Sequence, residues 1–162
     1  MIDILLDDDI KKDVENQLPS HQAIESAIQQ CCKCIEIDTQ APQVCIRFAH
    51  NDEVQSLNAQ WRNKDKVTDV LSFPMQEGEP YQANEPLGDI IMAMPFVLQE
   101  AERLQRDPKA HVLHLIIHGM LHLVGYDHIH DDEAKNMQTL ESEVMGILGL
   151  HQPYADHEGT HA

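Results

Sequence analysis

Closely spaced histidines are the residues of this sequence best suited to chemistry. Six of the 11 histidines lie between residues 111 and 130. His118 and His122 are four residues apart, so on a helix their imidazoles leave the same face about one turn apart and can reach one ion. Gly125 can adopt positive φ and turn the chain back, which brings His128 toward the face that the chain left. We therefore expect a metal centre formed by His118, His122 and His128.

Three imidazole ligands indicate a catalytic rather than a structural metal. Imidazole is a common zinc ligand, and a site with three protein ligands leaves a fourth position for water. Zinc lowers the pKa of that water to about 7, which gives hydroxide at neutral pH. The spacing predicts a hydrolase with one zinc ion per chain, in which His118 is a ligand and a catalytic residue. His130 competes with His128 as third ligand, but it lies farther from the turn and beside Asp131.

Two further polar residues lie close to this motif. His114 lies one turn before His118 on the same helical face, where it can contact a ligand, face substrate or be a partly buried histidine. Asp127 can orient a ligand through a hydrogen bond or serve as a polar turn residue. The spacing leaves these alternatives open for both residues.

The charge of the chain restricts its partners. The formal net charge is −17, and a field of that sign repels a phosphate backbone at long range. Arg62, Lys64 and Lys66 form a short cationic group with only Asp65 among them. Any contact with RNA is therefore expected to be local, at these three residues, and we expect no DNA partner.

The four cysteines, Cys31, Cys32, Cys34 and Cys45, do not form a metal-binding pattern. We expect space-filling thiols in a reducing compartment. The N-terminus does not resemble a secretory signal. The longest apolar stretch, residues 112–124, contains three histidines and is too short to span a bilayer. These features predict a cytoplasmic protein with no membrane partner.

The apolar pattern predicts the elements that position the histidines. Strands are expected at 1–6, 43–49, 68–74 and 87–94, and helices at 20–31, 51–61, 95–105, 109–124 and 131–148. This order predicts an α+β (mixed α/β) fold, a small mixed sheet of about four strands with about five packed helices and the metal-binding helix at the centre. We expect one catalytic domain over 1–150 and a disordered polar tail over 151–162.

Particular residues are expected to begin and anchor these helices. Ser20 and Asn51 are expected N-caps, and Gly125 is expected to end the histidine-bearing helix. The inward faces of two helices are expected to be Val54, Leu57 and Trp61, and Met137, Leu140, Val144, Ile147 and Leu148.

The string HGMLHLVGYDH at 118–128 resembles the signature of the YbeY family, zinc-dependent single-strand endoribonucleases of bacterial ribosomal RNA maturation. WRNKDKVTDVLSFP at 61–74 and LGDI at 87–90 resemble further blocks of that family, and DDEAKNMQTLE at 131–141 resembles its closing helix. Together these blocks cover most of residues 45–150.

The resemblance implies a zinc triad of His118, His122 and His128 and a functional arginine, which falls on Arg62. It implies cleavage of single-stranded RNA in maturation of the 3′ end of small-subunit ribosomal RNA and in ribosome quality control. The implied partners are ribosomal RNA and the small ribosomal subunit with its proteins. Arg62 is then the candidate for holding a phosphate, with Lys64 and Lys66 beside it. The roles of three other residues in the matching blocks can be structural: Thr68, Ser72 and Asp89.

Two other functions fit part of the pattern. The histidine register equals that of metzincin peptidases, whose general base is a glutamate after the first histidine. Here that position is Gly119, which cannot transfer a proton. A non-enzymatic ribosome-assembly factor with a structural zinc is the third possibility, and it predicts that metal removal unfolds the domain.

Overall fold

The computed structural model describes residues 2–37, 42–76, 85–126 and 131–154. The chain forms β1 (Ile2–Leu6), α1 (Lys11–Val14), a 3-10 turn (Glu15–Gln17), α2 (His21–Cys34), β2 (Gln43–Ala49), α3 (Asn51–Arg62), β3 (Val70–Pro74), β4 (Pro86–Ala93), α4 (Met94–Arg103), α5 (Pro108–Leu123) and α6 (Asp131–Ile147). The mixed α/β fold with a four-stranded sheet is confirmed, and the short α1 is an addition to the predicted helices. None of the helices in the described ranges is long and apolar enough to cross a membrane.

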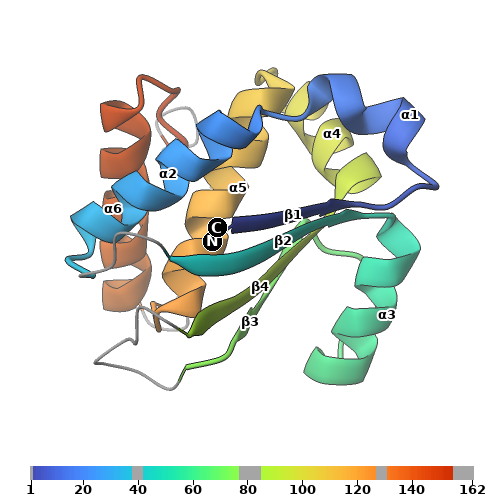
Figure 1. Ribbon diagram of the computed structural model, residues 1–162, viewed down its shortest axis with the longest axis horizontal. Helices are drawn as coiled ribbons and strands as arrows, with labels where there is room; N and C mark the ends of the chain where they lie inside the picture. Colours follow the sequence, from blue (N-terminus) through green and yellow to red (C-terminus); the bar gives the residue numbers. More distant parts are fainter. Residues whose placement is uncertain (1, 38–41, 77–84, 127–130, 155–162) are drawn as a thin grey trace.

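The sheet has the order β1-β2-β4-β3 (Figure 1). The strands β1, β2 and β4 are parallel, and β3 pairs antiparallel with β4 at one edge. Parallel strands need a crossover connection, and α2 lies in the one between β1 and β2. Ile4, Ile46 and Ile90 lie in register across the three parallel strands, so one face of the sheet presents an apolar surface.

The helices cover the two faces of this sheet unequally. Figure 1 shows α2 and α5 on one face and α3 on the other. The main core lies beneath α2 and α5, where Phe48, Ile90 and Ile116 are fully buried. A smaller cluster around Val54 lies beneath α3. The helix α5 is therefore central, as predicted, and its histidines are carried by the most deeply packed helix of the domain.

A glycine sets how closely α5 approaches the sheet. A Cβ atom added at Gly119 would lie 3.1 Å from two side-chain atoms of Ile90 and 3.2 Å from Ser72 Oγ. Such distances leave no room for a larger side chain without displacement of its neighbours. The glycine thus lets the segment around His118 lie directly beside β3 and β4.

The expected start of α2 is confirmed, because Ser20 Oγ accepts a hydrogen bond from the Ala23 amide at 3.1 Å. Gly125 has a φ of 97° and follows the end of α5, as expected. The cap of α3 is His50 and not Asn51, since His50 Nδ1 accepts from the Asp52 amide at 3.2 Å.

The predicted buried face of α3 is wrong at its last turn. Val54 is fully buried, but Trp61 is 63% exposed and Asn58 is buried in its place. The segment after the helix folds back, and Asn58 Nδ2 donates to the Lys66 carbonyl at 3.0 Å. Ile147, expected to face inward at the end of α6, is 56% exposed, whereas its neighbour Leu148 packs against the main core as expected.

Candidate metal centre and its cleft

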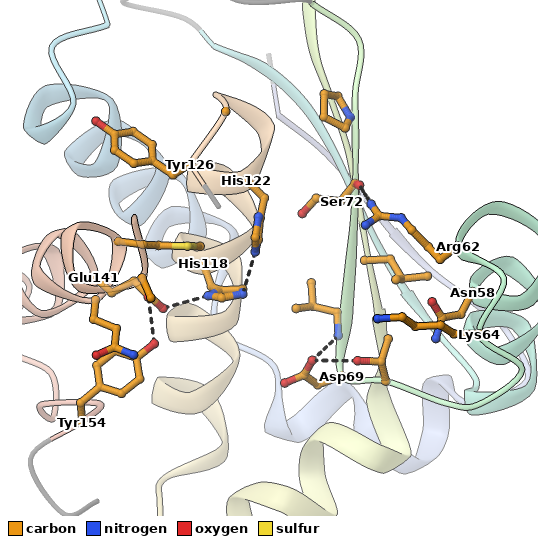
Figure 2. A pocket seen from close by; sticks show the side chains of 18 of the residues that line it. Asn58, Arg62, Lys64, Asp69, Ser72, His118, His122, Tyr126, Glu141 and Tyr154 are labelled. Carbon is orange, nitrogen blue, oxygen red and sulfur yellow. Dashed lines mark hydrogen bonds and ion pairs between the residues drawn. The ribbon is translucent and has the colours of Figure 1, made fainter. Parts of the chain in front are cut away.

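The imidazoles of His118 and His122 converge at the C-terminal half of α5. Their Nε2 atoms lie 3.1 Å apart, and their ring centroids are 4.6 Å apart. Residues four apart on a helix share a face, so the predicted helical spacing explains this convergence. Both side chains face the same space in Figure 2.

The expected third ligand lies outside the described residues, as do Asp127 and His130. Within the described ranges, no set of three or more His, Cys, Asp or Glu side chains is arranged to hold an ion. The structure therefore brings together two of the three expected ligands.

A carboxylate that sequence reasoning missed contacts His118 on the side of the ring away from His122. Glu141 of α6 is buried, with 1% exposure, and its Oε1 lies 3.1 Å from His118 Nδ1 and 2.8 Å from His114 Nε2. Tyr154 donates its hydroxyl to Glu141 Oε2 at 2.8 Å. His114 thus contacts the residue that holds His118. In the sequence, Glu141 is one of several acidic residues of a helix and is 23 positions from His118, so no local spacing pointed to it.

The histidines and the carboxylate change one another's ionisation. Burial raises the pKa of Glu141, but hydrogen bonds from His114 and His118 outweigh it and lower that pKa to about 2. Burial lowers the pKa of His118, but the hydrogen bond and charge of Glu141, with the charge of Asp69, raise it overall. The site therefore contains an ionised carboxylate next to a histidine that is easily protonated in the absence of a metal.

The histidine pair opens on a cleft of about 950 Å³ between β3 on one side and α5 and α6 on the other (Figure 2). Its walls carry the cationic group after α3, the first residues of β3 and one face of α6. The lining side chains that bear on chemistry are Arg62, Lys64, Lys66, Thr68, Asp69, Ser72, His118, His122, Tyr126, Glu141 and Tyr154. A cleft of this size can hold several groups of an extended ligand.

Arg62 is held at the edge of β3 on the wall opposite the histidines. Its Nη2 donates to the Ser72 carbonyl at 2.6 Å, and its guanidinium carbon lies 5.7 Å from the centre of the Phe73 ring. Ser72 Oγ in turn donates to the Gly119 carbonyl at 3.1 Å. Ser72 therefore links Arg62 to α5 and fixes the position of the guanidinium relative to His118.

Of the remaining residues from the sequence blocks, some line the cleft and some do not. Thr68 lines the cleft, whereas Asp89 of β4 does not. Asp69, another residue that sequence reasoning missed, lines the cleft and accepts from the Val70 amide at 2.8 Å. Burial and the charge of Glu100 raise the pKa of Asp69. The cysteines of α2 lie away from the cleft lining, and Cys31 and Cys32 are buried, as expected of space-filling thiols.

The position of Gly119 bears on the peptidase alternative. The glycine packs against Ile90 and Ser72 in the sheet. A metzincin requires a glutamate here as general base. A glutamate at this position would have to shift the side chains of Ile90 and Ser72, and the glycine that is present cannot act as that base.

The C-terminal residues of the described part pack on the domain. The carbonyl of Pro153 accepts from Arg106 Nη2 at 3.0 Å, and Tyr154 reaches Glu141. These contacts lie within residues 151–154, for which the sequence predicts a disordered tail. The rest of that tail, residues 155–162, lies outside the described residues.

Comparison with known proteins identifies a family for this chain. The sequence model of the family described as endoribonuclease YbeY matches residues 7–149. A protein named endoribonuclease YbeY from Bradyrhizobium diazoefficiens is 38% identical over 146 residues, which cover 88% of this chain and 80% of that protein. A protein of the same name from Rhizobium meliloti is 43% identical over 121 residues, covering 74% of this chain and 72% of the relative.

The fold also matches a solved structure. The solution structure of a Thermotoga maritima protein aligns with a TM-score of 0.54 and 24% identity, over 94% of this chain and 98% of that one. At this identity the likeness concerns the fold alone. The family match covers residues 7–149, which include β2 to β4 and the histidine-bearing helix, so the chain belongs to the endoribonuclease YbeY family.

Proposed function

We propose that this protein is a zinc-dependent endoribonuclease that cleaves single-stranded RNA in ribosomal RNA maturation and ribosome quality control. One observation carries the proposal: a converging histidine pair and a fixed arginine line the same cleft, His118 and His122 on one wall and Arg62 on the other. The family to which the chain belongs is described as endoribonuclease YbeY, which supports RNA as the substrate.

The histidine pair fits a zinc ion. Two nitrogen ligands at ~2.0–2.1 Å from a tetrahedral zinc are roughly 3.3 Å apart, and the two Nε2 atoms here are 3.1 Å apart. The other ring nitrogen of His118 contacts a carboxylate, an arrangement common for histidines that bind metals. His118, His122 and His128 would hold the ion, one per chain. Bound there, zinc supplies a Lewis acid and water acidic enough to attack near neutral pH.

The protein's own residues would bind and orient the RNA. A guanidinium has five N–H donors, and one nitrogen of Arg62 already donates to Ser72. The remaining donors can hold two oxygens of the scissile phosphate and stabilise the charge that develops on it. Lys64 and Lys66 lie along the same wall and would bind neighbouring phosphates.

The net charge of the protein bears on how it would meet its RNA substrate. With a net charge of −17, the protein repels a phosphate backbone at long range, and Arg62, Lys64 and Lys66 would supply the local positive charge on one wall of the cleft. We therefore place its action in the cytoplasm, on ribosomal RNA presented by the small ribosomal subunit and its proteins, where long-range attraction is not needed. The catalytic domain would comprise residues 1–150 together with the packed residues 151–154.

Single-turnover cleavage of a single-stranded RNA and of its fully paired duplex tests the proposal. The wild-type protein with one equivalent of zinc is expected to cleave the single strand and to leave the duplex intact. His118→Ala is expected to lose zinc and cleavage together. A peptidase would instead cleave casein and spare RNA, and an assembly factor with a structural zinc would cleave neither and unfold when zinc is removed.

A further inference from the structure

Glu141 occupies an unusual position for an acidic residue. Among the described residues it is the one fully buried carboxylate, with 1% exposure. Moving an ionised carboxylate out of water is costly unless donors replace the lost hydration. Here the two oxygens contact three side chains from two segments: His114 and His118 of α5, and Tyr154 after α6. The donors explain how the chain tolerates the buried charge.

This arrangement selects the tautomer of His118. An ionised carboxylate only accepts hydrogen bonds, so the Nδ1 atom that lies 3.1 Å from Glu141 must carry the hydrogen. The lone pair of a neutral imidazole is then on Nε2, the atom that faces His122 Nε2 at 3.1 Å. Glu141 therefore leaves the nitrogen that faces the cleft able to bind a metal.

Tyr154 holds the carboxylate from its other side. Its hydroxyl donates to Glu141 Oε2 at 2.8 Å, and the segment before it is anchored where Arg106 donates to the Pro153 carbonyl at 3.0 Å. Pro153 is buried. The carboxylate is thus fixed between α5 and the C-terminal segment, as Figure 2 shows for Glu141, His118 and Tyr154.

We propose that Glu141 is a positioning residue that orients His118 for metal binding, and that Tyr154 keeps its carboxylate in place. The inference rests on the proposed function, because it takes His118 as a ligand. It assigns the C-terminal segment a part in the metal centre. A carboxylate behind a ligand histidine fixes the ring and raises its basicity, and loss of such a group typically weakens metal binding about 10–100-fold.

The chain offers a matched control for this test. Glu100 of α4 contacts His111 of the same helix α5, with Oε1 and Nε2 2.8 Å apart. His111 does not line the cleft. Glu100→Gln and Glu141→Gln therefore make the same chemical change beside two histidines of one helix, of which only His118 is a proposed ligand.

The experiment measures zinc dissociation constants by chelator competition, with thermal melts of the metal-free proteins and visible spectra of the cobalt-substituted proteins. Glu141→Gln is expected to bind zinc about 10–100-fold more weakly and to shift the cobalt bands, with Glu100→Gln at the wild-type affinity. Tyr154→Phe, which removes one hydroxyl, is expected to weaken zinc binding roughly two- to tenfold. If Glu141→Gln does not fold without metal, the zinc affinity of Tyr154→Phe decides whether the positioning role holds.

Equal zinc affinities in the wild-type protein, Glu141→Gln and Tyr154→Phe would overturn the positioning role and leave the proposed function standing. An equal loss of affinity in Glu100→Gln would also overturn it, because any carboxylate that contacts a histidine of α5 would then have the same effect. Failure of the wild-type protein to bind zinc would refute the metal centre itself.

Discussion

The guanidinium of Arg62, the proposed phosphate-binding group, is held in a fixed place. One nitrogen donates to the Ser72 carbonyl, and Ser72 is tied to the backbone of α5. The sequence predicted Arg62 as the candidate for holding a phosphate but gave no geometry for its side chain. The structure shows instead that a strand edge orients this side chain, which favours a contact of defined geometry over a diffuse charge.

Arg62→Lys is accordingly expected to slow RNA cleavage while zinc content and folding stay unchanged. Lysine keeps the charge but has no planar fork, and it would lose the geometry of the Ser72 contact. Removing one well-placed transition-state donor costs on the order of 3 kcal/mol, or ~100-fold in rate, and lysine should recover part of that. In steady-state kinetics the loss should appear in kcat more than in KM. An unchanged rate would leave Arg62 without a catalytic role.

A second prediction at the residue scale concerns which histidine is the third zinc ligand. His128→Ala is expected to weaken zinc binding far more than His130→Ala, because Gly125 has a positive φ that turns the chain after α5 and His128 is the nearer of the two in the sequence. Zinc affinity should be measured in a chain that ends at Tyr154, which removes two tail histidines but keeps the contact with Glu141. A larger loss at His130 would assign the ligand to that residue instead.

Sequence reasoning at the residue level succeeded where the chemistry is local. The pair His118 and His122 could be predicted because both lie on one helix at a spacing set by its geometry. Glu141 and Tyr154 could not, because they reach His118 through the packing of α6 and the C-terminal segment. That packing depends on distant contacts and leaves no periodic pattern in the chain.

At the scale of elements, the close packing of α5 and β3 against β4 depends on glycine. Gly88 of β4 has a φ of 151°, and a Cβ atom added there would meet the Phe73 carbonyl oxygen and lie 2.7 Å from Leu123 Cδ2. The site needs this junction, because β3 carries Ser72 and α5 carries the histidines.

Gly88→Ala is therefore expected to destabilise the domain. The unfavourable φ and the forced contacts each cost about 1–3 kcal/mol, so a lower denaturant midpoint is expected in urea unfolding. Trp61→Ala is the matched control: its side chain is 63% exposed, and it should change the midpoint little. A similar loss in both variants would contradict the account of this junction.

The apolar pattern of the sequence also gave a wrong prediction for one element, the helix α3. The helix α3 has apolar residues at helical spacing, yet the last of them, Trp61, does not face the sheet. The following segment folds back onto Asn58 and leaves Trp61 in solvent. Hydrophobic periodicity predicts that a helix has an apolar face, but it does not say how far along the helix the neighbouring surface extends.

At the scale of the whole molecule, buried acid–histidine pairs make stability depend on pH. Burial raises the pKa of Glu100, but the hydrogen bond from His111 lowers it overall. A carboxylate with a lowered pKa stabilises the fold above its unfolded pKa of about 4.3, and this contribution is lost as the pH falls through the folded value.

The free energy of unfolding of metal-free wild-type protein should therefore fall more steeply than that of Glu100→Gln as the pH drops from about 6 to about 3. Chemical denaturation at several pH values measures this difference. The free energies of unfolding of the two proteins should converge at the acid end of this pH range. A difference that is constant across this range would show that the carboxyl charge of Glu100 contributes nothing.

The most direct test of the central claim is a zinc titration of the metal-free protein, with cleavage of single-stranded RNA followed under single-turnover conditions. The account predicts that cleavage is absent without metal, rises linearly with added zinc and stops rising at one equivalent per chain. His118→Ala should show no such rise. Equal cleavage by the metal-free protein, or stoichiometric zinc binding without any cleavage of RNA, would contradict it.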